Sequence, residues 1–386
     1  MGITISARQT FPCHQANWKH DMWHRIWHLI IKEFLALLKD KRSRFVVIVP
    51  PLVQLIVFGY AATFDLNHIP YAVYNEDRGE ASQRVLARLR GSPVFEEVAR
   101  LDHDRQIPPL IDHREALFVI HFGPRFSERL ARGQAAPLQV ILDGRNSNTA
   151  LITLGYLRTL LADFAIERLQ IAPPSHLVTR AWFNENLQSR WFIVPGIVAL
   201  LTLVVTMVTT ALTVAREREQ GTFDQLLVTP LTPFEILIGK MTPPFVIGLL
   251  EGSLILAVAV YWFEVPFRGA LGLLYAGLAV YLLAAIGVGL MISSLAVTQQ
   301  QGLMGAFLFI VPAVILSGFA TPIENMPETV QYITLLDPMR YFLVIVRTTF
   351  LADPAFTLLW PQFWPMVTIA AVTLVLAAWL FRHRLY

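Results

Sequence analysis

Long apolar stretches separated by short polar segments make up most of the chain. A helix needs about 20 predominantly apolar residues to cross a bilayer, and six stretches come close to that length. We therefore predict an α-helical integral membrane protein with six transmembrane helices. The spans are expected at residues 45–64, 191–214, 243–263, 271–292, 302–320 and 360–381.

Residues 65–190 break this pattern, because charged residues are frequent there and no apolar run is long enough to span. Short β-type segments alternate with segments of helical spacing, which is typical of a small α/β domain. At about 125 residues, the region is long enough to hold its own core. We predict strands at Ile69–Asn75, Val94–Val98, Ala116–His121 and Leu138–Asp143, and helices at Gly79–Arg90, Pro124–Arg132 and Thr149–Leu169.

An amphipathic helix is predicted before the first span, within residues 1–44. Apolar residues such as Trp23, Trp27 and Leu35 recur at helical spacing, whereas Lys32 and Glu33 are expected on the opposite face. This composition is typical of a helix that lies in a membrane interface, with tryptophans at the depth of the lipid headgroups.

Basic residues determine the predicted topology. Eight lysines and arginines precede residue 45, against three acidic residues, so the positive-inside rule places the N-terminus in the cytoplasm. Residues 65–190 then form an extracytoplasmic domain, residues 215–242 a cytoplasmic loop, and residues 382–386 a cytoplasmic C-terminus. We expect a multi-pass protein of the inner (plasma) membrane. No cleavable signal peptide is expected, because residues 1–20 lack an apolar core.

The overall composition supports the membrane class. The mean hydropathy is +0.51 and only 15% of residues are charged, against about 25% in soluble domains. The net charge of +3 gives no reason to expect a nucleic-acid partner. The single cysteine, Cys13, excludes an internal disulfide framework. A stripe at His20, His24 and His28 has no carboxylate or thiol placed to complete a metal site, so no metal is predicted.

The polar loop at residues 215–242 joins the second and third predicted spans. Its polar run Arg216–Gln220 is followed by a break at Gly221-Thr222, and then by a short amphipathic segment that ends at Pro230. Thr232-Pro233 can start the next helix, with proline in its first turn. From pattern alone, a loop at the lipid interface and a surface gripped by a soluble protein are equally good interpretations.

The residue order in this loop distinguishes the two interpretations. E-R-E-x-G-T-x-x-x-L-L-x-T-P-L, followed by Gly239-Lys240, closely resembles the signature of ABC-2 type transporter permeases. In that family the segment is the coupling helix, which docks into a groove on the ATP-hydrolysing subunit. The resemblance implies apolar contacts from Phe223, Leu226 and Leu227, with a polar rim at Glu217–Glu219. The implied coupling residues are Glu217, Arg218, Glu219, Gly221, Thr222, Phe223, Leu226, Leu227 and Pro230.

A second series, S-G-x-x-x-P…M-P…P-x-x-Y, resembles the same family between the last two spans. It begins at Ser317-Gly318 and ends at Tyr341. In ABC-2 permeases this external link dips back into the membrane as short helices, and we expect a re-entrant or interfacial segment at residues 321–359. The large external domain is most similar to the drug-efflux branch of the family.

Polar residues inside the spans are candidates for a translocation path. Thr202, Thr206 and Thr209 lie in the second span, where helix–helix packing is the more common role of hydroxyl residues. Glu251 lies in the third span, where a carboxylate is costly unless it faces protein or water. A substrate or proton contact and an interhelical hydrogen bond are equally good interpretations of Glu251.

No G-x-x-x-x-G-K-[ST] motif occurs, so we expect no enzymatic activity and no cofactor on this chain. The resemblance implies an exporter of lipophilic or drug-like molecules with two copies of a separate ABC ATP-binding subunit, which would hold ATP and Mg. It also implies a dimer with a second permease chain, identical or paralogous. Membrane lipid is a further partner, and a periplasmic adaptor protein stays open.

An alternative function is that of a membrane-anchored ligand sensor or scaffold acting through the extracytoplasmic α/β domain. A sensor needs a cytoplasmic output domain, and the predicted cytoplasmic segments are short. A membrane enzyme is a third option, but it needs clustered polar groups, and only Glu251 stands out inside the spans.

Overall fold

The computed structural model describes residues 18–39, 41–61, 66, 68–169, 182–184, 188–222 and 231–384. The chain forms two compact units. The helical unit comprises Met1–Thr63 and Ala181–Tyr386, and the α/β unit comprises Phe64–Arg180. The α/β unit is therefore one continuous insertion in the chain of the helical unit.

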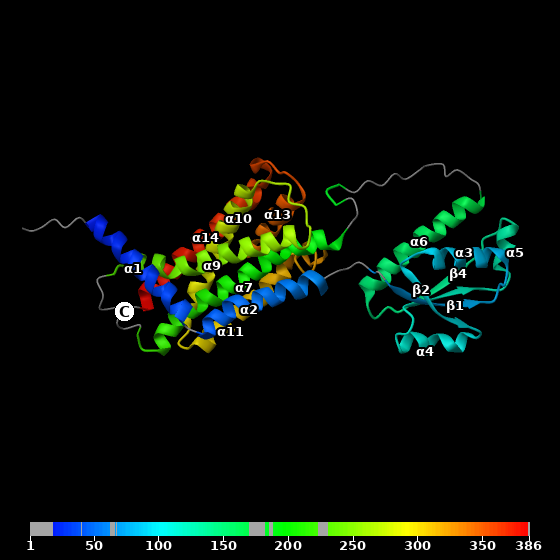
Figure 1. The fold of residues 1–386 in the computed structure, drawn as a ribbon, viewed down its shortest axis with the longest axis horizontal. Coiled ribbons are helices and arrows are strands. Elements are labelled where there is room, and N and C mark those ends of the chain that lie inside the picture. The colour runs from blue at the N-terminus through cyan, green and yellow to red at the C-terminus, as the bar shows by residue number, and fades with distance from the viewer. Residues whose placement is uncertain are drawn as a thin grey trace, which may run out of the picture. The chain divides into compact units, whose positions relative to one another are not determined.

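The helical unit is arranged around α7 (Figure 1). This helix, Ser189–Glu219, is buried along most of its length, because α2, α9, α10, α11 and α13 all pack against it. Helix α14 packs mainly on α10. The other helices are α1 (Trp18–Lys39), α2 (Lys41–Ala61), α9 (Pro233–Tyr261), α10 (Leu271–Leu295), α11 (Gln299–Leu316), α12 (Glu328–Ile333), α13 (Pro338–Leu351) and α14 (Phe356–Arg384).

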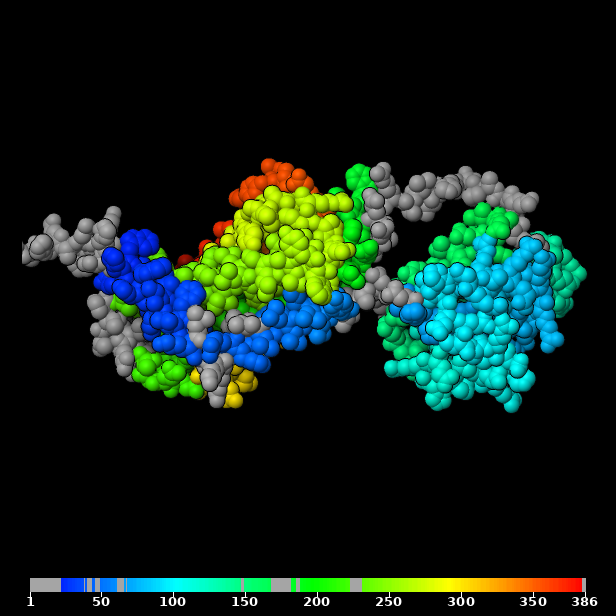
Figure 2. Space-filling view, in the orientation of Figure 1, coloured from blue at the N-terminus to red at the C-terminus, as the bar shows by residue number. Residues whose placement is uncertain are grey.

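The outer surface of the helical unit is apolar. Figure 2 shows α2 and α9 on one face of this unit. Large side chains on these two helices, such as Val53, Val57, Leu250 and Leu254, are exposed in the single chain. Soluble monomeric proteins rarely expose an apolar surface of this extent, because its contact with water is unfavourable. This surface therefore faces lipid or another chain.

Six helices in the described part of the chain are long and apolar enough to cross a membrane. Five of them, α7, α9, α10, α11 and α14, carry predicted spans. The sixth is Thr149–Glu167 in α6, whereas the predicted first span lies in α2, whose apolar described segment Val49–Tyr60 is shorter. The expected α-helical membrane fold with an inserted α/β domain is confirmed, but this set of six differs from the predicted set at one member.

Helix α6 (Ser147–Leu169) is a part of the α/β unit, because it buries Leu157 and Phe164 in the core of that unit. Its length and hydropathy match those of a membrane span, but its packing is that of a helix on a sheet. Length and composition do not distinguish these two environments, since both favour a long apolar helix.

The α/β unit contains a four-stranded sheet with the order β2-β1-β3-β4. Strand β1 is parallel to β2 and β3, and β4 is antiparallel to β3. Alternate residues of β1 point to opposite faces: Tyr71 and Val73 pack under α3, α5 and α6, and Ala72 packs towards α4. The elements are β1 (Ile69–Asn75), α3 (Glu80–Gly91), β2 (Phe95–Leu101), η1 (Asp104–Gln106), α4 (Ile107–Asp112), β3 (Phe118–Phe122), α5 (Phe126–Ala131) and β4 (Leu138–Leu142).

Short helices connect α11 to α14. The 3-10 turns Ile323–Asn325 and Thr334–Leu336 flank α12, and α13 has 14 residues, fewer than a span needs. Buried residues of α13 such as Phe342 pack in the core of the helical unit, where the ring stacks on Tyr281 at 4.6 Å. Short helices therefore connect the last two predicted spans, and the re-entrant or interfacial position of residues 321–359 stays a prediction.

Candidate functional site

The predicted coupling loop begins at the end of α7 and ends at the start of α9. Residues Gln220–Thr222 continue directly from α7, and Leu231 and Thr232 precede α9. Of the predicted coupling residues, Phe223, Leu226, Leu227 and Pro230 lie outside the described residues. Glu217, Arg218, Glu219, Gly221 and Thr222 lie within them.

Gly221 terminates α7 with a φ of +68°. Its N–H donates to the carbonyl of Arg218 at 3.1 Å, and the N–H of Thr222 donates to the carbonyl of Glu217 at 3.0 Å. This pair of bonds is the Schellman motif, which glycine favours because a Cβ is strained at positive φ. The Gly-Thr pair of the signature is therefore the point at which the chain leaves the helix.

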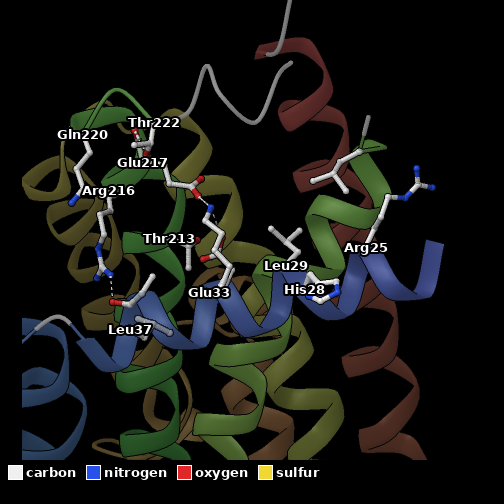
Figure 3. A pocket seen from close by; sticks show the side chains of 13 residues that line it. Arg25, His28, Leu29, Glu33, Leu37, Thr213, Arg216, Glu217, Gln220 and Thr222 are labelled. Carbon is white, nitrogen blue, oxygen red and sulfur yellow. Dashed lines mark hydrogen bonds and ion pairs between the residues drawn. The ribbon is translucent and has the colours of Figure 1, made fainter. Parts of the chain in front are cut away.

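Glu217 is buried at the centre of an ion cluster, which we define as Lys32, Glu33, Glu217 and Lys240. Lys240, only 1% exposed, donates to Glu217 Oε2 at 2.5 Å and to Glu33 Oε1 at 3.2 Å. Lys32 donates to Glu217 Oε1 at 2.6 Å. The cluster joins three helices, because Lys32 and Glu33 are on α1, Glu217 is on α7 and Lys240 is on α9. Figure 3 shows Glu33 and Glu217 pointing towards one another.

The pKa of Lys32 is shifted by its neighbours in the ion cluster. Burial alone lowers the pKa of its ammonium group, but the hydrogen bond and the negative charge of Glu217 outweigh burial and raise the pKa above its ordinary value. The group therefore stays charged at neutral pH, and the ion cluster is held by charge-assisted hydrogen bonds.

Arg218 and Glu219 hold the turn between α10 and α11. Arg218 Nη1 donates to the carbonyl oxygens of Ser294 and Ala296, at 2.9 and 3.4 Å, where α10 ends. Glu219 Oε2 accepts a hydrogen bond from the N–H of Gln299 at 2.7 Å, where α11 begins. Helix ends leave carbonyl and N–H groups without partners, and a cation at a C-terminus and an anion at an N-terminus suit the helix dipole.

The first turn of α9 is also tied to α1. Thr232 and Glu235 form a capping box at the start of α9, with Pro233 in the first turn, as the sequence predicts. The buried Glu235 also pairs with Arg25 of α1 at 3.0 Å. Both ends of the loop are thus attached to neighbouring helices.

A pocket of about 650 Å³ lies between α1 and the end of α7 (Figure 3). Its walls are largely apolar, and charged groups stand at its sides. The lining residues include Arg25, His28, Leu29, Ala36, Leu37 and Leu231.

Helix α1 keeps Glu33 on the face opposite the tryptophans, as the sequence predicts. What the sequence does not show is that this face is buried, with Glu33 on the inner side between Leu29 and Leu37. Trp23 and Trp27 are exposed on the outside. The spacing of Leu29, Glu33 and Leu37, at i, i+4 and i+8, could have identified a buried charge, since a glutamate within an apolar stripe needs a partner. His24 and His28 contribute to no group of three metal-ligating side chains among the described residues.

The predicted path threonines lie between helices within the single chain. Thr202 and Thr209 donate to carbonyls of their own helix, Val198 and Val205, each at 2.6 Å. A Cβ at Gly248 of α9 would lie 2.7 Å from Thr206 Oγ1, so α7 and α9 are in close contact there. The role of these three threonines in transport stays a prediction.

Glu251 is buried on α9. Neither of its carboxylate oxygens has a hydrogen-bond partner among the described residues, and the same holds for Thr206 Oγ1. The interhelical hydrogen bond that the sequence leaves open for Glu251 is therefore not found within this part of the chain.

Comparison with known proteins identifies a matching family and several relatives. Residues 41–379 match the family described as "ABC-2 family transporter protein". The chain is 41% identical over 366 residues to "Probable multidrug ABC transporter permease YbhR" of Escherichia coli (strain K12), covering 94% of this chain and 100% of that protein. It is 34% identical to "Probable multidrug ABC transporter permease YbhS" of the same strain, covering 86% and 89%. It is 28% identical to "Inner membrane transport permease YhhJ", covering 93% and 97%.

Proposed function

Because the chain belongs to the ABC-2 family of transporter proteins, we propose that it is the permease subunit of an ATP-driven exporter. Its substrate is a lipophilic or drug-like molecule, taken from the cytoplasm or the inner leaflet. Two of the relatives are named as multidrug permeases, and this supports the substrate class. The permease is a non-enzymatic membrane subunit, and ATP is hydrolysed on a separate ABC subunit present in two copies.

One observation carries the proposal: the residues on both sides of Phe223–Pro230 are bonded to several helices at once. Before this segment, Glu217 joins α7 to α1 and α9, and Arg218 and Glu219 hold the ends of α10 and α11. After it, Glu235 of α9 pairs with Arg25 of α1. The residues that flank the segment therefore contact five helices directly. A segment placed in this way is suited to transmit the closure of an ATPase to the membrane part.

This assignment requires the loop to face the cytoplasm, where ATP is available. The basic residues before residue 45 and at the C-terminus support that orientation through the positive-inside rule. The α/β unit would then be extracytoplasmic, where it gates the exit or docks a periplasmic adaptor. The inner membrane location printed in the name of one relative agrees with this arrangement.

A second permease chain completes the path in this proposal. The exposed apolar faces of α2 and α9 support an interface with lipid or with another chain. Glu251 and Thr206 are the favoured path residues, because their polar atoms have no hydrogen-bond partner among the described residues. Thr202 and Thr209 are weaker candidates, since their hydroxyls bond to their own helix.

The test is an affinity pull-down of the tagged full-length chain in mild detergent, comparing the native protein with Leu226→Asp/Leu227→Asp. We expect an ATPase to co-elute with the native chain and to be lost with the variant, because two carboxylates in an apolar groove cannot be desolvated without a large penalty.

A matched control carries the same chemical change elsewhere. Val98→Asp/Leu151→Asp alters two exposed apolar residues of the α/β unit and is expected to retain the ATPase. If no ATPase co-elutes with the native chain, the permease assignment fails and a sensor or scaffold becomes the better reading. If the Leu226/Leu227 variant retains the ATPase, docking at these residues is wrong.

A further inference from the structure

We propose that Lys240 is a positioning residue that makes α1 move as one rigid body with the end of α7 and the start of α9, the two helix ends that flank the coupling loop. The inference rests on the proposed function, because it concerns how the motion of an ATPase is passed on. Lys240 is the group at which all three helices meet, since it bonds both to Glu217 of α7 and to Glu33 of α1. If Glu33 or Glu217 moved away, the buried ammonium group of Lys240 would lose a counter-charge.

Next to Lys240, Gly239 of α9 lies in close contact with Leu29 of α1. A Cβ at Gly239 would lie 2.3 Å from Leu29 Cδ2 and 3.3 Å from Leu29 Cβ. The absence of a side chain at Gly239 therefore lets α1 lie directly on α9. Apolar packing and the ion pairs act at the same level of the two helices, so sliding of α1 along α9 would break both.

Further bonds attach α1 along its length. Arg25 pairs with Glu235 in the first turn of α9, and Arg216 of α7 donates to the carbonyl of Ala36 at 3.4 Å. Helix α1 is therefore bonded to residues on both sides of Phe223–Pro230. A helix fastened only to stabilise the fold needs no attachment to both ends of one loop.

The other face of α1 makes a joint movement feasible. Trp23 is 64% and Trp27 60% exposed, and Ile31 and Leu35 continue the same stripe. An apolar stripe of this kind can move within a lipid interface without losing a protein contact. Since α1 ends at Lys39 and α2 begins at Lys41, its displacement also reaches α2, which packs on α7.

A disulfide tests joint movement directly. The chain has one cysteine, so Cys13→Ser gives a cysteine-free background for Leu29→Cys/Gly239→Cys, whose Cβ atoms are close enough to be bridged. The readout is ATP hydrolysis by the purified complex with the ATPase that co-elutes, before and after oxidation. We expect a change of less than about twofold, because a link between two parts that move together does not discriminate between the two states.

A second variant tests the ion link itself. Glu33→Gln removes the bond from α1 to Lys240 and leaves the bond between Lys240 and Glu217 in place. We expect hydrolysis to fall at least about fivefold, the low end of coupling between sites, while the ATPase still co-elutes. Oxidation of Leu29→Cys/Gly239→Cys in the Glu33→Gln chain is expected to restore hydrolysis, and reductant to lower it again to the level of the unoxidised variant.

The outcomes separate the inference from the proposed function. If the ATPase co-elutes but oxidation of the disulfide pair blocks hydrolysis, α1 moves against α9 and the inference is wrong, while the proposed function stands. Unchanged hydrolysis in Glu33→Gln likewise overturns it. A native chain that binds no ATPase overturns both.

Discussion

Two buried glutamates show how partners decide the role of a side chain. Glu217 and Glu251 both lie on long apolar helices and are largely excluded from solvent. Glu217 accepts hydrogen bonds from Lys32 and Lys240, whereas the carboxylate oxygens of Glu251 have no partner among the described residues. An apolar environment penalises a carboxylate that has no partner. We therefore expect Glu217 to stabilise the fold of the single chain and Glu251 to destabilise it.

The same substitution at the two sites is expected to act in opposite directions. Glu217→Met should lower the free energy of unfolding by about 3–5 kcal/mol, because it leaves the buried ammonium of Lys240 with one counter-charge fewer. Glu251→Met should raise it by about 1–3 kcal/mol, the usual penalty of an unsatisfied buried polar group. Thermal unfolding followed by tryptophan fluorescence in detergent measures both. A shift of the same sign in the two variants would contradict this explanation.

At the scale of elements, close approach of helices decides where glycine is required. Helix α10 contacts α14 along its length, and at Gly287 a Cβ would lie 2.2 Å from Thr373 Oγ1 and 3.0 Å from the backbone nitrogen of Leu374. At Gly272, near the start of the same helix, no such atom of the described residues lies within 4 Å. The two glycines look alike in the sequence and differ only in what faces them.

Gly287→Ala is therefore expected to destabilise the helical unit, whereas Gly272→Ala is not. An added methyl group in a filled contact typically costs about 1–3 kcal/mol. In the open position alanine is the better helix former, by about 1 kcal/mol. The midpoint of heat-induced aggregation, followed by size-exclusion chromatography, would rank the two variants. Equal midpoints would mean that α10 and α14 are not packed this closely.

Elements that local residues determine could be predicted from the sequence, whereas features that depend on distant partners could not. Strand β1 has the predicted bounds Ile69–Asn75, and α9 begins with the predicted Thr232-Pro233 pair, since local turn and capping residues determine both. The sequence does not identify Lys240 as the partner of Glu33, because the two residues are 207 positions apart in the chain. The membrane-like hydropathy of α6 does not reveal that this helix belongs to the α/β unit, where Leu157 and Phe164 pack in the core.

Across the whole molecule, the two units differ in where their apolar side chains lie. The helical unit is a bundle whose outside is apolar, and the α/β unit holds its own core around a sheet. Within the α/β unit, Asp77 joins the loop after β1 to the first turn of α5. Its carboxylate accepts hydrogen bonds from the Oγ and N–H of Ser127, at 2.5 and 2.8 Å, and from the N–H of Gly79 at 3.2 Å.

The α/β unit is therefore expected to lose stability in acid. Burial alone raises the pKa of Asp77, but the hydrogen bonds from Ser127 outweigh it and hold the pKa below its ordinary value of 3.8. A carboxyl group with a lowered pKa stabilises the folded state above its ordinary value, and this contribution disappears as the pH falls through the lowered pKa.

Calorimetry of the full chain in detergent, from about pH 8 to about pH 3, tests this dependence. Asp77→Asn should unfold at a lower temperature than the native chain near pH 7, and the difference should shrink towards the acid end. Asp102→Asn changes an exposed carboxylate of the same unit and serves as the matched control. A difference that is constant with pH would contradict the role of ionised Asp77.

The continuous insertion of the α/β unit has a consequence for the history of the gene. Phe64–Arg180 enters the chain between α2 and α7, two helices that pack on each other. A single recombination event at this place can remove, replace or lengthen the α/β unit, because it interrupts none of the described helices of the helical unit. The two units are therefore free to evolve at different rates within one reading frame.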